Sequence, residues 1–184
     1  IQGDENMKTL ILNGSPREGN STAAAEILKK GLSNIQDLSV EEVRADDLSV
    51  SPCIACGACG CEGNCVFDDD TNEIIGKICD ADTVIFVTPV YWWGMTAQLK
   101  IVLDRMYSKS EGKLGDKKIG YVIIGGDDTS NIQYELISKQ FDSIAKYLDW
   151  KVVFAEKYSA YGKDEIADNQ EKMDYFRELG KNFK

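Results

Sequence analysis

Short apolar runs alternate along the chain with longer segments in which apolar residues recur every three or four positions. A short apolar run bounded by turn residues is typical of a strand that is buried on both faces. Such runs predict strands at residues 10–12, 83–88, 119–124 and 150–155, and a more polar run predicts an edge strand at 38–43.

Helical spacing marks the segments between these runs. Apolar residues three and four positions apart fall on one face of a helix. The spacing predicts five helices, which are marked by Ala24, Ile27, Leu28 and Leu32; by Ile74, Ile75, Ile78 and Cys79; by Leu99, Val102, Leu103 and Met106; by Ile137, Phe141, Ile144 and Leu148; and by Met173, Phe176 and Phe183.

Strands and helices that alternate over the whole length predict an α/β fold in which helices cover both faces of a parallel sheet. Five such strands fit a flavodoxin-like, doubly wound, five-stranded parallel sheet of order 2-1-3-4-5, whose ligand site lies at the carboxyl ends of strands one and three. A chain of 184 residues suits one domain. We expect this domain over residues 7–184, with 51–70 inserted as a cysteine-rich loop.

The loop after the first strand, residues 13–22, combines glycines, hydroxyl groups and one arginine. Gly14, Pro16 and Gly19 interrupt regular structure, and the polar residues that follow are of the type that caps a helix N-terminus. Free backbone N–H groups and the helix dipole favour an anion at such a loop. The candidate phosphate ligands are Ser15, Arg17, Asn20, Ser21 and Thr22, the last three being the predicted capping residues.

The residues that this loop lacks narrow the choice of anion. No lysine follows the second glycine, which disfavours a nucleoside triphosphate with its metal. Bulky side chains at residues 15–18 prevent the close backbone approach that a dinucleotide pyrophosphate needs. A phosphate monoester surrounded by hydroxyl groups fits best, which indicates a mononucleotide such as FMN. An ordinary strand-to-helix turn remains the alternative.

The loop after the third strand is the second part of the predicted site. Three adjacent aromatic residues in a loop lower solubility unless something covers them, and a flat isoalloxazine ring would cover them. A contact between two copies of the chain is the alternative. Gly125 and Gly126, at the end of the fourth strand, let the backbone approach the same ring, although a plain turn explains them equally well. The candidate ring-binding residues in the loop are Pro89, Val90, Tyr91, Trp92, Trp93 and Gly94.

Five of the six cysteines fall within residues 53–65. Thiolates at this spacing can bind one metal centre, so the candidate metal ligands are Cys53, Cys56, Cys59 and Cys65. A 4Fe-4S cluster, zinc, and free or disulfide-linked thiols all remain open, although zinc sites usually have two cysteine pairs joined by a longer spacer. Cys61 could replace one ligand, and Cys79 is expected in the core. Residues 68–70, an acidic run, are expected to form a solvated turn that caps the next helix.

Composition excludes several classes of function. The formal net charge is -10 and no Lys/Arg cluster occurs, so we expect neither nucleic acid nor a membrane as partner. The chain has no histidine, which excludes Ser/His and Cys/His nucleophilic catalysis. Residues 1–6 show no signal-peptide pattern and precede a methionine, so we expect Met7 to be the native start and the protein to be cytoplasmic with reduced cysteines.

The two loops and the segment from Lys100 to Asp104 and Arg105 resemble the NAD(P)H-dependent FMN reductase family of flavodoxin-like proteins. The cysteine spacing resembles the compact motif of the iron-sulfur flavoprotein branch of that family. The resemblance implies non-covalent FMN, with its phosphate in the first loop and its ring on residues 89–95. It also implies NAD(P)H as cosubstrate and assembly as a homodimer or homotetramer.

The function expected from these features is that of an FMN-dependent oxidoreductase. It takes hydride from NAD(P)H and passes electrons to a small-molecule or protein acceptor, through an iron-sulfur cluster where one is bound. No side chain is needed as acid or base at the hydride step, in agreement with the absence of histidine. Two alternatives belong to other classes: a flavodoxin-type electron carrier that is not an enzyme, and a zinc-binding interaction module without flavin.

Overall fold

A five-stranded parallel sheet of order β2-β1-β3-β4-β5 forms the centre of the molecule, as seen in a computed structural model that describes residues 6–112 and 114–181. The topology confirms the predicted flavodoxin-like fold. Strands β1 and β3 are buried along most of their length because helices cover both of their faces. The strands are β1 (Met7–Asn13), β2 (Leu38–Arg44), β3 (Thr83–Pro89), β4 (Lys118–Gly125) and β5 (Lys151–Ser159).

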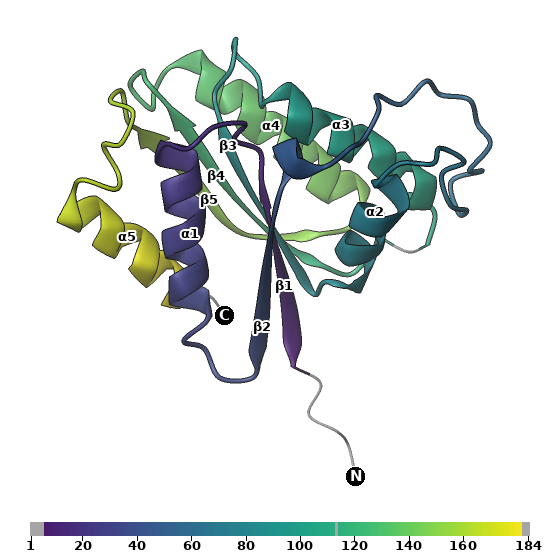
Figure 1. Cartoon of the computed structure of the whole chain (residues 1–184), viewed down its shortest axis with the longest axis horizontal. Coiled ribbons are helices and arrows are strands. Elements are labelled where there is room, and N and C mark those ends of the chain that lie inside the picture. Colours follow the sequence, from purple (N-terminus) through teal and green to yellow (C-terminus); the bar gives the residue numbers. More distant parts are fainter. Residues whose placement is uncertain (1–5, 113, 182–184) are drawn as a thin grey trace.

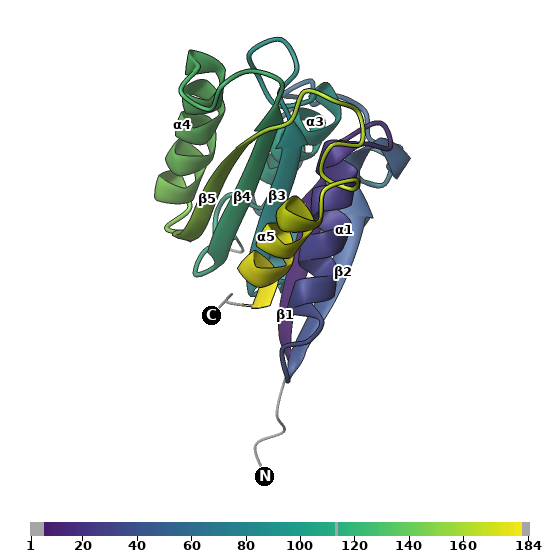
Figure 2. The same cartoon turned by 90° about the vertical axis from the view of Figure 1, so that its left-hand side faces the viewer.

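Helices cover the two faces of the sheet unequally. Figure 1 and Figure 2 show α1 and α5 together on one face, and α2, α3 and α4 on the other. The helices are α1 (Asn20–Leu32), α2 (Thr71–Asp80), α3 (Ala97–Arg105), α4 (Ile132–Tyr147) and α5 (Gln170–Lys181), with two short 3-10 turns, η1 (Ala45–Asp47) and η2 (Met106–Lys109).

Each face of the sheet has its own core. On the larger face, Phe141 of α4 stacks on Phe86 of β3 and on Tyr121 of β4, with ring centroids 5.2 Å and 5.0 Å apart. On the smaller face, α1 and α5 cross at two glycines, and a Cβ added at Gly31 would lie 2.4 Å from the Arg177 carbonyl oxygen. Only glycine permits this close approach, so the sequence of α1 determines how near α5 can lie.

The structure differs from the prediction mainly at the carboxyl-terminal end. The fifth strand was expected at 150–155 and runs from Lys151 to Ser159. Its side chains are half-buried or exposed, because it lies at the edge of the sheet, so its apolar signal is weak. The predicted edge strand β2 is confirmed. In α5, Met173 and Phe176 pack in the smaller core, whereas Phe183 lies outside the described residues.

The cysteine-rich loop leaves the body of the fold between η1 and α2. Figure 1 shows this segment extending beside α2 and α3, on the face opposite α1 and α5. Residues 1–5 lie outside the described part of the chain, so the expected start at Met7 stays a prediction. No helix in the described ranges is long and apolar enough to cross a bilayer.

Candidate functional site

The loop after β1 is held by β3 and α3. The Gly14 N–H donates to the Val87 carbonyl at 2.8 Å, and the Thr96 hydroxyl, at the start of α3, donates to the Gly14 carbonyl at 2.7 Å. A Cβ at Gly14 would lie 2.9 Å from Leu99 Cβ. Gly14 is therefore required by the packing of α3 against the loop, which ties the first and third strand ends together.

The N-terminus of α1 is buried and has no side-chain cap. The helix begins at Asn20 after Gly19, its first turn holds no acidic residue, and the bond from the Ala23 N–H to the Gly19 carbonyl measures 2.9 Å. Asn20, Ser21 and Thr22 lie inside this first turn, so their predicted capping role is wrong. Buried N–H groups that lack an acceptor among the described residues, at the positive end of a helix dipole, favour an anionic ligand.

The three loop hydroxyl groups differ in what they can donate. The hydroxyls of Ser15 and Thr22 both donate to the Arg17 carbonyl, at 2.7 Å and 3.0 Å. A hydroxyl has one proton, so these two shape the loop and cannot also donate to a ligand. Ser21 is buried and makes no hydrogen bond to any described residue, and it lines the cleft described next. Ser21 is therefore the loop hydroxyl whose proton is available to a ligand.

Asn20 connects α1 to the segment that follows β5. Its side-chain amide donates to the Gly162 carbonyl, and its side-chain oxygen accepts a hydrogen bond of 2.9 Å from the Ile166 N–H. Both polar ends of the side chain are thus used within the chain. We infer that Asn20 positions this segment beside the loop, and that its backbone N–H and the second N–H of its side-chain amide remain as donors for a ligand.

A cleft opens at the carboxyl edge of the sheet, between the loops after β1, β3, β4 and β5. The two loops singled out in the sequence therefore lie side by side, as their places after β1 and β3 require. Of the predicted site residues, Thr22, Trp92, Trp93 and Gly94 do not line the cleft. Those that do are Ser15, Arg17, Asn20, Ser21, Pro89, Val90, Tyr91 and Gly126.

The aromatic loop forms a tight turn that directs two of its rings outward. Tyr91 and Gly94 exchange two backbone hydrogen bonds of 2.9 Å and 3.0 Å, and the two residues between them, Trp92 and Trp93, have positive φ angles of 47° and 62°. This is the geometry of a type I′ turn, which normally carries Asn-Gly. Trp92 is 91% exposed and Trp93 50% exposed. Tyr91 is therefore the one aromatic residue of the triplet at the cleft.

The four cysteines with metal-ligand spacing line one cavity between the loop and the end of α3. Cys53, Cys56, Cys59 and Cys65 share this cavity with Arg105 and Ser108. Cys61 is not part of the lining, and its side chain hydrogen-bonds the Tyr107 hydroxyl, which raises the pKa of Tyr107. No disulfide joins any two of the six cysteines, all of which lie in the described part of the chain.

The grouping of possible metal ligands among the described residues bears on what the cavity can hold. No three Cys, Asp or Glu side chains among them converge on one point as a mononuclear site requires. Four thiols around one cavity match the ligand chemistry of an iron-sulfur cluster, whose irons are separate from one another.

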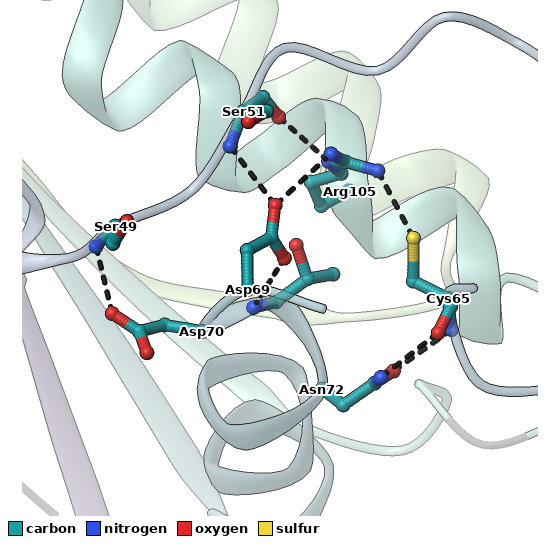
Figure 3. Close-up of polar contacts among 8 residues, drawn as sticks. Ser49, Ser51, Cys65, Asp69, Asp70, Asn72 and Arg105 are labelled. Atoms are coloured by element: carbon teal, nitrogen blue, oxygen red, sulfur yellow. Dashed lines mark hydrogen bonds and ion pairs between the residues drawn. The ribbon is translucent and has the colours of Figure 1, made fainter. Parts of the chain in front are cut away.

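A buried ion pair closes the cysteine-rich loop at its base. The Arg105 guanidinium lies 3.3 Å from the Asp69 carboxylate, and the Asp69 side chain is only 9% exposed (Figure 3). The carboxylate also accepts hydrogen bonds of 3.0 Å from the Ser51 and Thr71 N–H groups. Burial alone would raise the pKa of Asp69, but these hydrogen bonds and the Arg105 charge hold it below its ordinary value. The expected solvated turn is therefore wrong for Asp69.

The neighbouring Asp70 also bonds to the chain instead of capping α2. Its carboxylate accepts a hydrogen bond of 2.7 Å from the Ser49 N–H, and no side chain caps the N-terminus of α2. Asp68 alone in the acidic run is exposed. Asp69 and Asp70 thus close the cysteine-rich loop at two points. The charge and spacing of the acidic run did not predict this role.

A sequence model of the NADPH-dependent FMN reductases matches residues 7–160. The chain belongs to this family. It is 37% identical over 123 residues to an iron-sulfur flavoprotein of Methanocaldococcus jannaschii, a match that covers 65% of this chain and 62% of the relative. It is 38% identical over 104 residues to an iron-sulfur flavoprotein of Methanosarcina thermophila, covering 54% and 52%. The chain thus spans somewhat more than half the length of these curated relatives.

Solved structures show the same fold. An NAD(P)H:quinone oxidoreductase from Methanothermobacter marburgensis superimposes with a TM-score of 0.74 over 96% of each chain, at 20% sequence identity. At this identity the likeness concerns the fold alone.

Gly125, which was predicted with Gly126 at the end of the fourth strand, also lines the cleft, whereas Tyr161 of this FMN reductase family member was missed in the sequence. A Cβ at Gly125 would lie 2.7 Å from the Tyr134 hydroxyl oxygen and 2.9 Å from Val90 Cγ2, so glycine is needed here for packing. Tyr161 follows β5 and was missed because the fifth strand was expected to end at residue 155. The alternation of burial along 155–159 reveals the longer strand only once its edge position is known.

Proposed function

We propose that this chain is an FMN-dependent oxidoreductase that takes hydride from NAD(P)H and passes electrons to a small-molecule or protein acceptor. The observation that carries the proposal is the buried, uncapped N-terminus of α1, with Ser21 unbonded, in the cleft that Pro89 and Tyr91 also line. Bound FMN supplies the redox chemistry, and the protein supplies binding and orientation. Membership of the FMN reductase family supports the same assignment.

Each part of the cleft has a separate task in this proposal. The first-turn N–H groups of α1 and the Ser21 hydroxyl hold the phosphate, and Arg17 at the rim adds positive charge. Pro89, Val90 and Tyr91 contact the isoalloxazine ring on one side. Residues 125–126 lack side chains at the cleft wall, so the ring can lie against backbone there. No side chain has to transfer a proton.

The cysteine-rich loop holds a 4Fe-4S cluster in this proposal. The support is the set of four thiols around one cavity, together with a buried hydroxyl there, Ser108, that has no partner among the described residues. Relatives that are named iron-sulfur flavoproteins agree with it. A bound cluster converts two-electron input into single-electron output.

Flavin binding is tested at the hydroxyl that the fold leaves unbonded. Ser21→Ala removes one donor to a charged phosphate and should weaken FMN binding about tenfold, equivalent to about 1.4 kcal/mol. Ser33→Ala, at the opposite end of the same helix, is the matched control because its exposed hydroxyl bonds to Lys29. Titration of the apoprotein with FMN measures both. Equal FMN affinities of Ser21→Ala and Ser33→Ala would contradict a contact between the Ser21 hydroxyl and the phosphate.

The reductase activity is tested by anaerobic stopped-flow mixing with NADPH and with NADH. Bleaching of the flavin absorbance at a rate that supports turnover is expected with at least one of them. If bleaching is too slow for turnover with both NADPH and NADH, the reductase assignment is wrong although FMN is bound. The protein would then be an electron carrier.

The cluster is tested by iron, sulfide and zinc analysis of anaerobically purified protein. A 4Fe-4S cluster contains four irons, so we expect about four irons per chain. We expect Cys59→Ser to lose iron. Cys61→Ser is the matched control, because Cys61 belongs to the same loop and lies off the cavity. Stoichiometric zinc, or iron unaffected by Cys59→Ser, would contradict the assignment.

A homodimer or homotetramer in a reducing, cytoplasmic compartment completes the proposal. The exposed indoles of Trp92 and Trp93 and the exposed ring of Tyr161 support a subunit contact near the cleft. The absence of disulfides among the described cysteines supports a reducing compartment. Sedimentation velocity on the wild type and on Trp92→Ala tests the assembly, and a wild-type monomer at micromolar concentration would contradict it.

A further inference from the structure

Arg105 is the residue that joins the fold to the cysteine-rich loop. It is the last residue of α3, it is 3% exposed, and every nitrogen of its guanidinium has a partner in the loop (Figure 3). Nε donates to the Ser51 carbonyl at 2.8 Å, one terminal nitrogen donates to Cys65 Sγ at 3.0 Å, and the other faces Asp69. The planar fork of arginine suits three such partners at once, whereas lysine cannot reach all three.

Cys65, whose sulfur contacts Arg105, is also held through its backbone. The Cys65 N–H donates to the Asn72 side-chain oxygen at 2.8 Å, and the Asn72 amide donates back to the Cys65 carbonyl at 2.9 Å (Figure 3). The guanidinium also stacks on the Phe67 ring, 4.5 Å from its centroid. Cys53 and Cys56 are exposed by contrast. Cys65 is therefore the best-fixed of the four ligands, and Arg105 is the group that orients its sulfur.

Ser108 presents a second donor to the same cavity. It lies three residues after Arg105, in η2, and is 4% exposed. Its hydroxyl oxygen is buried and has no hydrogen-bond partner in the described parts of the chain, and the residue lines the cavity that the four cysteines line. A buried hydroxyl without a hydrogen-bond partner is energetically unfavourable. A sulfur atom in the cavity would accept a hydrogen bond from this hydroxyl and remove that cost.

We propose that Arg105 and Ser108 are positioning residues that donate hydrogen bonds to the sulfur atoms of the group in the cysteine cavity and thereby raise its reduction potential. The inference rests on the cluster assignment above. A donor near sulfur stabilises the reduced, more negative state over the oxidised state. Asp69 offsets much of the Arg105 charge, so the effect comes mainly from hydrogen-bond direction. Electrons entering from the flavin would thus meet a more easily reduced acceptor.

The test is a redox titration of the purified holoprotein. The cluster is reduced stepwise by dithionite, one electron per cluster, and the reduced form is counted by EPR. R105Q should make reduction about tenfold less favourable, which is about 59 mV for one electron. R105K should recover part of this shift because it keeps the charge and one donor. S108A should shift the potential in the same direction by a smaller amount.

The matched control is R177Q, which removes the same charge from α5. Arg177 is partly exposed and pairs with Asp174, on the face of the sheet opposite the cysteine-rich loop (Figure 1). Its potential should equal that of the wild type. If an Arg105 variant assembles no cluster, S108A decides the matter, because removing an unpartnered hydroxyl does not disturb the fold.

The outcomes separate this inference from the cluster assignment. Unchanged potentials in R105Q, R105K and S108A, with full iron content, would overturn the inference and leave the cluster in place. A wild-type protein without iron would overturn the cluster assignment itself. A shift in R177Q as large as that in R105Q would show that net charge, and not the local hydrogen bond, sets the potential.

Discussion

The cleft at the strand ends and the cysteine-rich loop lie at two places on one fold and are built in different ways. The cleft lies where four parallel strands end, and its walls are held by backbone bonds such as that from Gly14 to Val87. The cysteine-rich loop has no strand or helix between η1 and α2. It is closed by the side chains of Asp69, Arg105 and Asn72, and apolar residues such as Ile54 are exposed on it.

This difference predicts how each region responds to substitution. A site built from strand ends tolerates the loss of one side chain, because the sheet still positions the backbone N–H groups. A loop held by a few buried polar contacts loses several of them when one partner is removed. The predictions below test this contrast, in order of decreasing effect.

Asp69→Asn should lower the free energy of unfolding by about 3 kcal/mol, because it removes the carboxylate charge that pairs with the buried Arg105 guanidinium. Asp68→Asn, one residue earlier and exposed, should change it by less than about 0.5 kcal/mol. Urea unfolding of the holoprotein followed by circular dichroism measures both.

The same pair of variants has a predicted pH dependence. The pKa of Asp69 is lowered in the folded state, so its contribution is present above the unfolded pKa of about 3.9 and is lost as the pH falls through the folded value. The gap between the wild type and Asp69→Asn should therefore narrow below about pH 4. A gap that stays constant down to pH 2 would show that the carboxylate charge is not its source.

Gly14→Ala should destabilise the protein by about 2 kcal/mol and weaken FMN binding, because the new Cβ would press on Leu99 and separate α3 from the loop. Gly76→Ala, in the middle of α2, meets nothing within 4 Å and should stabilise by up to about 1 kcal/mol. Thermal unfolding and FMN titration of both variants check this. Similar behaviour of the two glycines would refute the packing role of Gly14.

Thr22→Val should lower the free energy of unfolding of the apoprotein by about 1.5 kcal/mol and leave FMN affinity nearly unchanged, because its hydroxyl donates to the Arg17 carbonyl and not to a ligand. Ser21→Ala should do the reverse. The two variants thus separate loop shape from ligand contact. A large loss of FMN affinity in Thr22→Val, with normal stability, is the contradictory result.

In the separate subunit, Trp93→Gly should raise the free energy of unfolding by about 1 kcal/mol, since glycine adopts the positive φ of this turn without strain. For a chain of this size the expected rise in Tm is about 3 °C. FMN affinity should not change, because Trp93 does not line the cleft. A fall in Tm would mean that contacts of the indole outweigh the strain of the turn.

The strand order and the position of the cleft could be predicted because buried parallel strands carry a strong apolar signal and their carboxyl ends share one edge. The loop after β1 was predicted at this cleft for the same reason, although the capping role of Asn20, Ser21 and Thr22 was wrong. Whether a residue caps a helix depends on the position at which the helix starts. The types of residue near the start do not specify this position to within one residue. The outward direction of Trp92 and Trp93 depends on a turn type for which their side chains are unfavourable.

The sequence by itself determined the fold, the two loops that meet at the cleft, and the cluster of thiols, because each of these follows from local pattern and spacing. Only the tertiary structure decided which hydroxyl remains able to donate, that Asp69 is buried, and that Arg105 contacts Cys65 from 40 residues away. These outcomes depend on which groups meet across the fold and on which donors the chain itself has already used. No local pattern records that, since hydrogen-bond partners far apart in sequence become neighbours only when the helices pack on the sheet.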